Sequence, residues 1–424
     1  MSSKNKSFAI LFFLTTLYTL AAAIPETGRY FKELLPFDQM MREFVRENEI
    51  PGAALAVAKD DRLLYARGFG WADRENMKPV QPHSLFRIAS ISKPITAVAI
   101  LRLAEGRKLK LDDKAFALLP HKPHLVKGTK VDVRLKQITI RHLLQHRGGW
   151  DRAQSMDAMF QPVRFARALG KAPPASADDV TRFMRGWPLD FDPGARYAYS
   201  NFGYNVLGRI IEEKTGKSYE EYVRSNVLKP LGITAMRIGK TLPAGRAKDE
   251  VRYYTRGNRT GLSVMASNFG ERVPRPYGTW HLEAMDSHGA WIASVIDLVR
   301  FGSAVENFRK SKILSPGSIN AMTQRPKGKA GSDAKGKPKP VYYGLGWSVR
   351  PVGDKSNRWH TGSLDGTAAL LVLRHDGLCW AVLFNTRSTP KGSHAGRQID
   401  PLLHKAAAAV KEWPAHDLFK ETRN

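Results

Sequence analysis

The sequence predicts an α/β (α+β) fold: one mixed antiparallel sheet, flanked by helices, is built from both ends of the chain, and a helical domain is inserted between them. Two observations lead to this prediction. Strand-like segments occur near the start of the chain and return near its end, while the long middle shows the spacing of helices. The chain has 424 residues, of which 42% are hydrophobic, and this is enough for one large or two medium-sized domains with a buried core.

The first quarter of the chain predicts a helix, a hairpin of two strands, a short third strand and a long apolar helix. In order, these elements cover residues 29–49, 53–58, 63–70, 84–89 and 90–106. Pro51-Gly52 ends the first helix, and Lys59-Asp60-Asp61 forms the turn of the hairpin. We therefore expect the N-terminal end to supply the first strands of the sheet.

The rest of the chain predicts a helical middle, three more strands and a closing helix. The clearest helices cover residues 140–146, 204–214 and 297–308, the strands cover residues 342–349, 368–374 and 379–385, and the closing helix covers residues 401–410. We therefore predict one domain of residues 30–410. Its sheet subdomain comprises about residues 30–90 and 290–410, and its helical subdomain comprises about residues 91–289.

The first 23 residues have the pattern of a cleaved secretory signal peptide. A basic start at Lys4 and Lys6 precedes an apolar run, and Ala21-x-Ala23 is a small-residue cleavage signal. The apolar run of about 16 residues is shorter than the roughly 20 that span a bilayer, so we expect no stable transmembrane span. The single cysteine, Cys379, cannot form an internal disulfide, and we expect it to be buried. These features predict a secreted or periplasmic protein of a bacterial envelope.

The chain is strongly basic, with a formal net charge of +28. This charge favours contact with an anionic cell-envelope polymer, and residues 325–340 form a low-complexity basic segment that we expect to be a flexible loop. The sequence contains no helix-turn-helix, zinc-finger or ribonucleoprotein motif, so we expect no nucleic-acid partner. It also lacks a phosphate loop and a dinucleotide fingerprint, and we expect no cofactor.

Three short motifs point to serine acyl transfer: Ser90-Ile91-Ser92-Lys93, Tyr199-Ser200-Asn201 and His360-Thr361-Gly362. Ser-x-x-Lys occurs four times in the chain, but only the copy at Ser90 follows a predicted strand and opens a long apolar helix. Lys214-Thr215-Gly216 has the letters of a third motif as well. We reject it because it ends a helix, with the glycine in the C-terminal capping position.

Ser90 and Lys93 have the spacing of a nucleophile and its base. Positions i and i+3 share one face of a helix, so the lysine can lie beside the serine. A desolvated lysine loses its proton near neutral pH and can then accept the hydroxyl proton of the serine. The backbone N–H of Ser90, in the first turn, has no partner within the helix and is a candidate oxyanion donor.

The other two motifs supply candidate proton carriers and substrate-binding groups. Tyr199 is expected to act as a second proton carrier, with its phenolate stabilised by nearby cations, and Asn201 to hold a substrate carbonyl or the lysine. His360-Thr361-Gly362 is expected to begin a strand and to bind substrate. In it, His360 would bind a carboxylate when protonated or pass a proton, and Gly362 would let substrate approach the backbone. The N–H of Ser363 is the second candidate oxyanion donor.

Five segments resemble the penicillin-recognising serine hydrolases, a group of class C β-lactamases, DD-peptidases and β-lactamase-fold esterases. The segments are residues 86–113, 138–149, 199–223, 343–347 and 360–366. This resemblance implies the β-lactamase/transpeptidase-like fold, acylation at Ser90, acid–base work shared by Lys93 and Tyr199, and an oxyanion hole of the Ser90 and Ser363 amides. His360 stands where class C β-lactamases carry lysine, and a histidine there is similar to DD-peptidases.

The leading hypothesis is therefore an exported serine hydrolase that cleaves an amide or ester, similar to a β-lactamase or D-alanyl-D-alanine carboxypeptidase. A strict β-lactamase, a β-lactamase-fold esterase and a non-catalytic binding protein of the cell envelope are the alternatives. A metal enzyme is a further alternative, because His142 and His146 are four residues apart on a predicted helix, which is a spacing of metal ligands. No Glu follows His142, so we read the pair as structural and predict no metal site.

Overall fold

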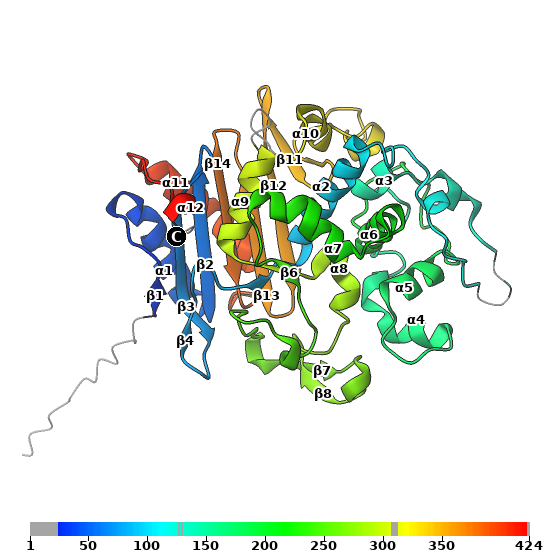
Figure 1. Cartoon of the computed structure of the whole chain (residues 1–424), viewed down its shortest axis with the longest axis horizontal. Coiled ribbons are helices and arrows are strands. Elements are labelled where there is room, and N and C mark those ends of the chain that lie inside the picture. The colour runs from blue at the N-terminus through cyan, green and yellow to red at the C-terminus, as the bar shows by residue number, and fades with distance from the viewer. Residues whose placement is uncertain (1–23, 126–127, 129, 307–312, 422–424) are drawn as a thin grey trace, which may run out of the picture.

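Both ends of the chain build one large sheet, as the sequence predicts. The computed structural model describes residues 24–125, 128, 130–306 and 313–421. A nine-stranded sheet has the order β1-β3-β2-β14-β13-β12-β11-β10, with β4 paired to β3, and all its neighbours are antiparallel. The N-terminal strands, blue in Figure 1, lie directly beside the orange C-terminal strands. The strands of this sheet are β1 (Glu26–Thr27), β2 (Gly52–Lys59), β3 (Arg62–Asp73), β4 (Lys78–Pro79), β10 (Tyr342–Tyr343), β11 (Ser348–Val352), β12 (Lys355–Leu364), β13 (Thr367–Leu373) and β14 (Leu378–Phe384).

Helices cover both faces of the sheet, and most of those between the two sets of strands lie on one side of it (Figure 1). The helices are α1 (Leu35–Glu47), α2 (Ser92–Glu105), α3 (Ile140–Leu144), α4 (Pro162–Ala168), α5 (Ala177–Met184), α6 (Asn201–Thr215), α7 (Tyr219–Val223), α8 (Asp286–Gly289), α9 (Val295–Glu306), α10 (Pro316–Thr323), α11 (Ala395–Ala409) and α12 (Leu418–Glu421). Smaller sheets join β5 (Phe86–Arg87), β9 (Trp291–Ala293) and β6 (Arg237–Ile238), and β7 (Thr260–Leu262) with β8 (Arg272–Pro274). The predicted boundaries between the sheet subdomain and the helical subdomain stay a prediction.

Strand β2 shows how the sequence separates the two cores. Its side chains alternate, so Leu55 and Val57 enter the core formed with α1 and α11. Ala54 and Ala56 face the opposite core, which contains α2 and α9. The small alanines leave room for α9 to pack directly against the strand. The long helix α2 is apolar on nearly every side because it lies inside this second core.

Several predicted boundaries differ from the structure. The first predicted helix starts only at Leu35, and the closing helix starts earlier than predicted, at Ala395, with Pro401 inside it. The predicted strand 342–349 is two strands, because Gly346 has φ 86° and turns the chain between β10 and β11. The last two residues of the predicted helix 297–308 lie outside the described residues, as does the predicted signal peptide of residues 1–23.

Residues 325–340, the predicted basic loop, fold back on themselves. Arg325 Nη1 donates to the carbonyl oxygens of Gly331 and Lys339 at 2.9 and 2.6 Å, and Ser332 forms a bridge with Pro338. The mobility of this loop stays a prediction. In the described part of the chain, no helix has the length and apolar character needed to cross a membrane.

Candidate active site

Ser90 lies in a tight turn that joins β5 to α2. The strand predicted at residues 84–89 is confined to Phe86–Arg87, and a 3₁₀ turn of Ala89–Ile91 precedes the α-helix. Ala89 has φ 46°, an uncommon conformation for a residue with a side chain, so this turn is strained. Ser90 therefore lies just before the helix rather than in its first α-helical turn, and it lines a cavity of about 1400 Å³.

Lys93 lies beside Ser90 and is completely buried. Its Nζ is 3.1 Å from Ser90 Oγ, and it donates to Asn201 Oδ1 at 2.8 Å and to the carbonyl oxygen of His288 at 2.9 Å. Burial holds the pKa of Lys93 well below its ordinary value, because the buried site disfavours the charged form. A neutral amine has two hydrogens and one lone pair. In that neutral form the amide and the carbonyl would take the two hydrogens, which leaves the lone pair for the Ser90 hydroxyl.

Asn201 is oriented by a carboxylate that sequence reasoning missed. Its Nδ2 donates to Asp157 Oδ2 at 2.7 Å, so its Oδ1 must face Lys93. Asn201 is the first residue of α6, whose N-terminus is capped by the Ser200 hydroxyl. No sequence pattern marks Asp157, because it lies in a loop 44 residues before Asn201.

Tyr199 contacts Ser90 through its hydroxyl. It donates to Ser90 Oγ at 2.8 Å, and its ring packs against His146 with centroids 4.3 Å apart. Burial raises the pKa of Tyr199. In the resting site Tyr199 is therefore a neutral hydroxyl, and its expected role as a second proton carrier stays a prediction.

Burial of Lys93 should change how kcat/KM depends on pH. Because its pKa in the folded protein is depressed, Lys93 becomes a neutral base as pH rises through a value well below the ordinary lysine value of about 10.4. We expect kcat/KM to rise with pH and to reach its plateau well below the ordinary lysine pKa. Steady-state kinetics on a neutral ester from pH 4 to 10 will measure this. A rise that begins only near the ordinary lysine pKa would contradict it.

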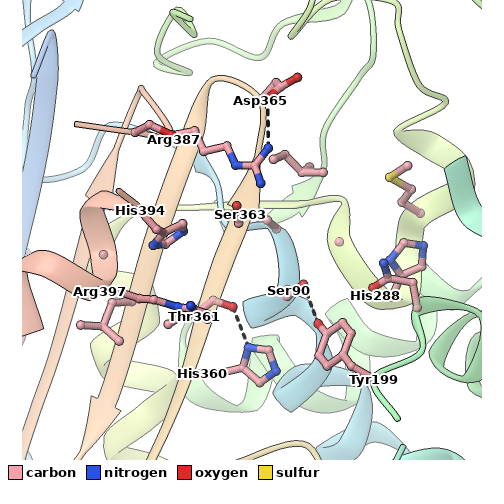
Figure 2. A pocket seen from close by; sticks show the side chains of 18 of the residues that line it. Ser90, Tyr199, His288, His360, Thr361, Ser363, Asp365, Arg387, His394 and Arg397 are labelled. Atoms are coloured by element: carbon pink, nitrogen blue, oxygen red, sulfur yellow. Dashed lines mark hydrogen bonds and ion pairs between the residues drawn. The ribbon is translucent and has the colours of Figure 1, made fainter. Parts of the chain in front are cut away.

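The third motif lies within a strand rather than at its start. His360, Thr361 and Gly362 belong to the second half of β12, where Gly362 pairs with Ala369 of β13. A Cβ on Gly362 would overlap the carbonyl oxygen of Ile88, in the segment that leads to the nucleophile. The glycine thus allows β12 to approach the Ser90 turn. The sequence alone instead predicted that Gly362 allows close approach of the substrate. Ser363 and Thr361 line the same cavity as Ser90 (Figure 2).

Replacing Gly362 with alanine should therefore separate β12 from the nucleophile's turn. A displacement of about 1 Å at reacting groups costs on the order of 100-fold in rate, and we expect kcat/KM to fall by about that factor. Gly317→Ala is the control, because a Cβ there meets only the Ser315 hydroxyl at 3.9 Å. Both variants are compared by ester kinetics and thermal unfolding. Wild-type kcat/KM in Gly362→Ala would show that this contact does not position the site.

His360 is neutral and engaged by the protein on both ring nitrogens. Its Nδ1 is 2.8 Å from the carbonyl oxygen of Thr361, which can only accept, so this nitrogen carries the hydrogen. Its Nε2 then accepts from the Tyr343 hydroxyl at 2.9 Å. Burial lowers the pKa of His360 to about 3. Burial therefore disfavours the protonated His360 that was expected to bind a carboxylate, and the role of His360 in substrate binding stays a prediction.

The structure brings Ser90, Lys93, Tyr199 and Asn201 into direct contact, while their catalytic roles stay predictions. Sequence reasoning missed the carbonyl of His288, a backbone group that leaves no motif. His142 and His146 have local structural contacts: His142 closes the capping box of α3, and His146 Nδ1 accepts from the backbone N–H of Ser200. Gly216 caps α6 in the left-handed conformation at φ 68°, which confirms the rejection of the Lys214 motif.

Comparisons with known proteins agree with this geometry. The sequence profile of the family described as Beta-lactamase matches residues 37–403. The chain is 26% identical over 377 residues to Protein flp of Staphylococcus aureus (strain N315). The aligned region covers 88% of this chain and 67% of that protein. It is also 32% identical over 200 residues to Esterase EstB of Burkholderia gladioli, covering 46% and 49% of the two chains.

Among solved structures, the D-amino acid amidase from Ochrobactrum anthropi SV3, complexed with L-phenylalanine amide, has the same fold. It superposes with a TM-score of 0.66 at 20% identity and covers 90% of this chain and 99% of the amidase. The family profile spans most of the chain, including all three motifs and every strand of the large sheet except β1. The protein therefore belongs to the Beta-lactamase family and is a serine hydrolase of the β-lactamase fold.

Proposed function

We propose that the protein is an exported hydrolase that cleaves an amide or ester through an acyl-Ser90 intermediate, in the manner of a D-alanyl-D-alanine carboxypeptidase. One observation carries this proposal: the Nζ atom of the fully buried Lys93 lies 3.1 Å from the Ser90 hydroxyl, and burial lowers the pKa of this lysine. A serine hydroxyl is a weak nucleophile at neutral pH and needs such a base within hydrogen-bond reach. The second contact to Ser90 Oγ, from Tyr199, supplies a proton donor on the same atom.

In the proposed reaction, Ser90 Oγ attacks the substrate carbonyl carbon while Lys93 takes the hydroxyl proton. The backbone amides of Ser90 and Ser363 stabilise the oxyanion. The bond to the leaving group breaks as Tyr199 gives that group its proton, and Tyr199 is reprotonated from Lys93. Water then attacks the acyl-serine by the same steps in reverse and releases the acid.

The substrate class is the part of the proposal that draws on relatives. A D-amino acid amidase shares the fold, and an esterase shares part of the sequence, so amides of D-amino acids and simple esters are the first substrates to test. A β-lactamase and a β-lactamase-fold esterase remain the second candidates. Export and contact with an anionic envelope polymer are further predictions, which rest on the leader and on the net charge of +28.

Intact-mass spectrometry of the purified protein after brief mixing with benzylpenicillin tests the proposal. We expect an adduct that persists and that peptide mapping assigns to Ser90, because a peptidase-like enzyme deacylates slowly from penicillin. Consumed penicillin without an adduct would favour the β-lactamase. If penicillin stays intact, the same measurement is repeated with a fluorophosphonate and a p-nitrophenyl ester, and an esterase is favoured where only these react. A protein that reacts with none of them at Ser90 is not the proposed hydrolase.

A further inference from the structure

Three arginines converge on one carboxylate at the wall of the active-site cavity. Asp365 lies in the turn between β12 and β13, and its side chain is only 6% exposed. Arg275 Nε lies 2.7 Å from Asp365 Oδ2, while Arg259 Nη2 and Arg387 Nη1 each lie 3.2 Å from Oδ1. We call Asp365 and these three arginines the arginine cluster. One carboxylate offsets only one of three positive charges, so the cluster has a net charge of +2.

The guanidinium groups remain accessible although they share a buried partner. The side chains of Arg259, Arg275 and Arg387 are 55%, 42% and 50% exposed. All three line the cavity that contains Ser90, and its lining holds five arginines against two aspartates. A single arginine would neutralise Asp365. Two additional half-exposed cations therefore indicate that this wall attracts an anion.

The position of the cluster relates it to one part of the substrate. Asp365 is two residues beyond the candidate oxyanion donor Ser363, which corresponds to about 7 Å along a strand. Figure 2 shows Tyr199 and His360 on one side of Ser90, with Asp365 and Arg387 on the other side, beyond Ser363. The leaving group must meet the proton donor Tyr199. The part of the substrate that extends toward the cluster is therefore the acyl part.

We propose that the arginine cluster is a subsite for a carboxylate carried by the acyl part of the substrate. This inference rests on the proposed acylation of Ser90 and narrows its substrate class to acyl groups with a distal negative charge. Arg387 and Arg259 bind the carboxylate through their exposed N–H groups, while Arg275 holds Asp365 in place from its other oxygen. Two guanidinium forks on one carboxylate give both charge and direction to the contact.

Matched esters test the subsite. The probes are p-nitrophenyl monoesters of adipic, suberic and sebacic acid, each compared with the ester in which the distal carboxylate is a methyl ester. We expect kcat/KM to favour the anionic member of at least one pair by about tenfold or more at low salt, and less at high salt because exposed charges are screened. Arg387→Gln and the double variant Arg259→Gln/Arg387→Gln should remove this preference, because kcat/KM for the anionic esters falls far more than kcat/KM for the neutral esters.

Arg256→Gln is the matched control. Arg256 lies in the same loop region and is 48% exposed, but it pairs with Glu49 at 3.1 Å and does not line the cavity. The Arg256→Gln substitution removes one positive charge without changing the arginine cluster, so the preference for the anionic esters should remain. Equal loss of the preference in Arg256→Gln would reduce the effect to net charge and overturn the subsite. A preference for a carboxylate on the leaving group, tested with hexanoate esters of p-hydroxybenzoate and its methyl ester, would overturn the placement.

The outcomes separate this inference from the proposed function. Neutral esters cleaved at Ser90 without any anionic preference would overturn the subsite and leave the hydrolase intact. If no ester reacts at Ser90, the proposed function fails, and binding of the suberate dianion is measured by titration calorimetry instead. Binding that weakens about tenfold in Arg387→Gln but not in Arg256→Gln would support the subsite. Absent or unchanged binding would overturn it.

Discussion

Ser90→Ala should abolish both the covalent adduct and the hydrolysis of esters and amides. The substitution removes the hydroxyl that contacts both Lys93 Nζ and the Tyr199 hydroxyl, so no acyl-enzyme can form. Intact mass after exposure to penicillin or a fluorophosphonate measures the adduct, and release of p-nitrophenol measures turnover. We expect no adduct and a rate lower by at least four orders of magnitude, comparable to the loss of a whole nucleophile–base unit.

Ser332→Ala is the matched control for this experiment. Ser332 begins another Ser-x-x-Lys sequence, with Lys335, but it lies in the folded basic loop and does not line the active-site cavity. It should keep the adduct and the wild-type rate. Continued labelling of the Ser90→Ala variant at another serine would instead place the nucleophile elsewhere and contradict the proposed reaction.

Lys93→Met should slow acylation by about two to four orders of magnitude, the range expected for a lost general base. Methionine fills most of the buried volume but cannot accept the proton of Ser90. The rate of adduct formation, followed by stopped mixing and mass spectrometry, is the appropriate measurement because it isolates acylation from deacylation. Near-normal acylation would move the base to another group.

This substitution also has a structural effect that must be measured. The Asn201 Oδ1 atom and the His288 carbonyl would lose their buried donor, and each loss costs about 1–3 kcal/mol of unfolding free energy. Thermal unfolding separates this effect from catalysis: a folded Lys93→Met protein that does not acylate supports the base. Lys335→Met, in the exposed basic loop, controls for the loss of one charge and should change neither quantity.

Hydrophobic periodicity was sufficient to predict the sheet and its origin from both chain ends, because the central strands β2, β13 and β14 bury side chains on both faces. Leu378 to Phe384, for example, is buried at every position, and the sequence shows this directly as a continuous apolar run. The boundaries were less accurate. The start of α11 at Ala395 and the glycine-dependent turn before β11 depend on neighbouring elements, and local propensity does not encode those neighbours.

At the candidate site, too, the sequence predicted some features, and others depended on the folded structure. The sequence identified Ser90, Lys93, Tyr199 and Asn201 because short-range spacing and motif order are written in the chain. It did not indicate that the resting site favours neutral forms of Tyr199 and His360, since this follows from burial, which only the folded structure sets.

The sequence by itself thus determined the family, the strand and helix content and the residues that meet at the candidate site. The tertiary structure alone decided which partners complete that centre: Asp157 orients Asn201, the His288 carbonyl takes a hydrogen of Lys93, and Gly362 lets β12 reach the nucleophile's turn. It also gathered the arginine cluster from segments up to 128 residues apart. The physical reason is that desolvation, hydrogen bonding and charge sharing depend on distances in space, whereas motifs record distances along the chain.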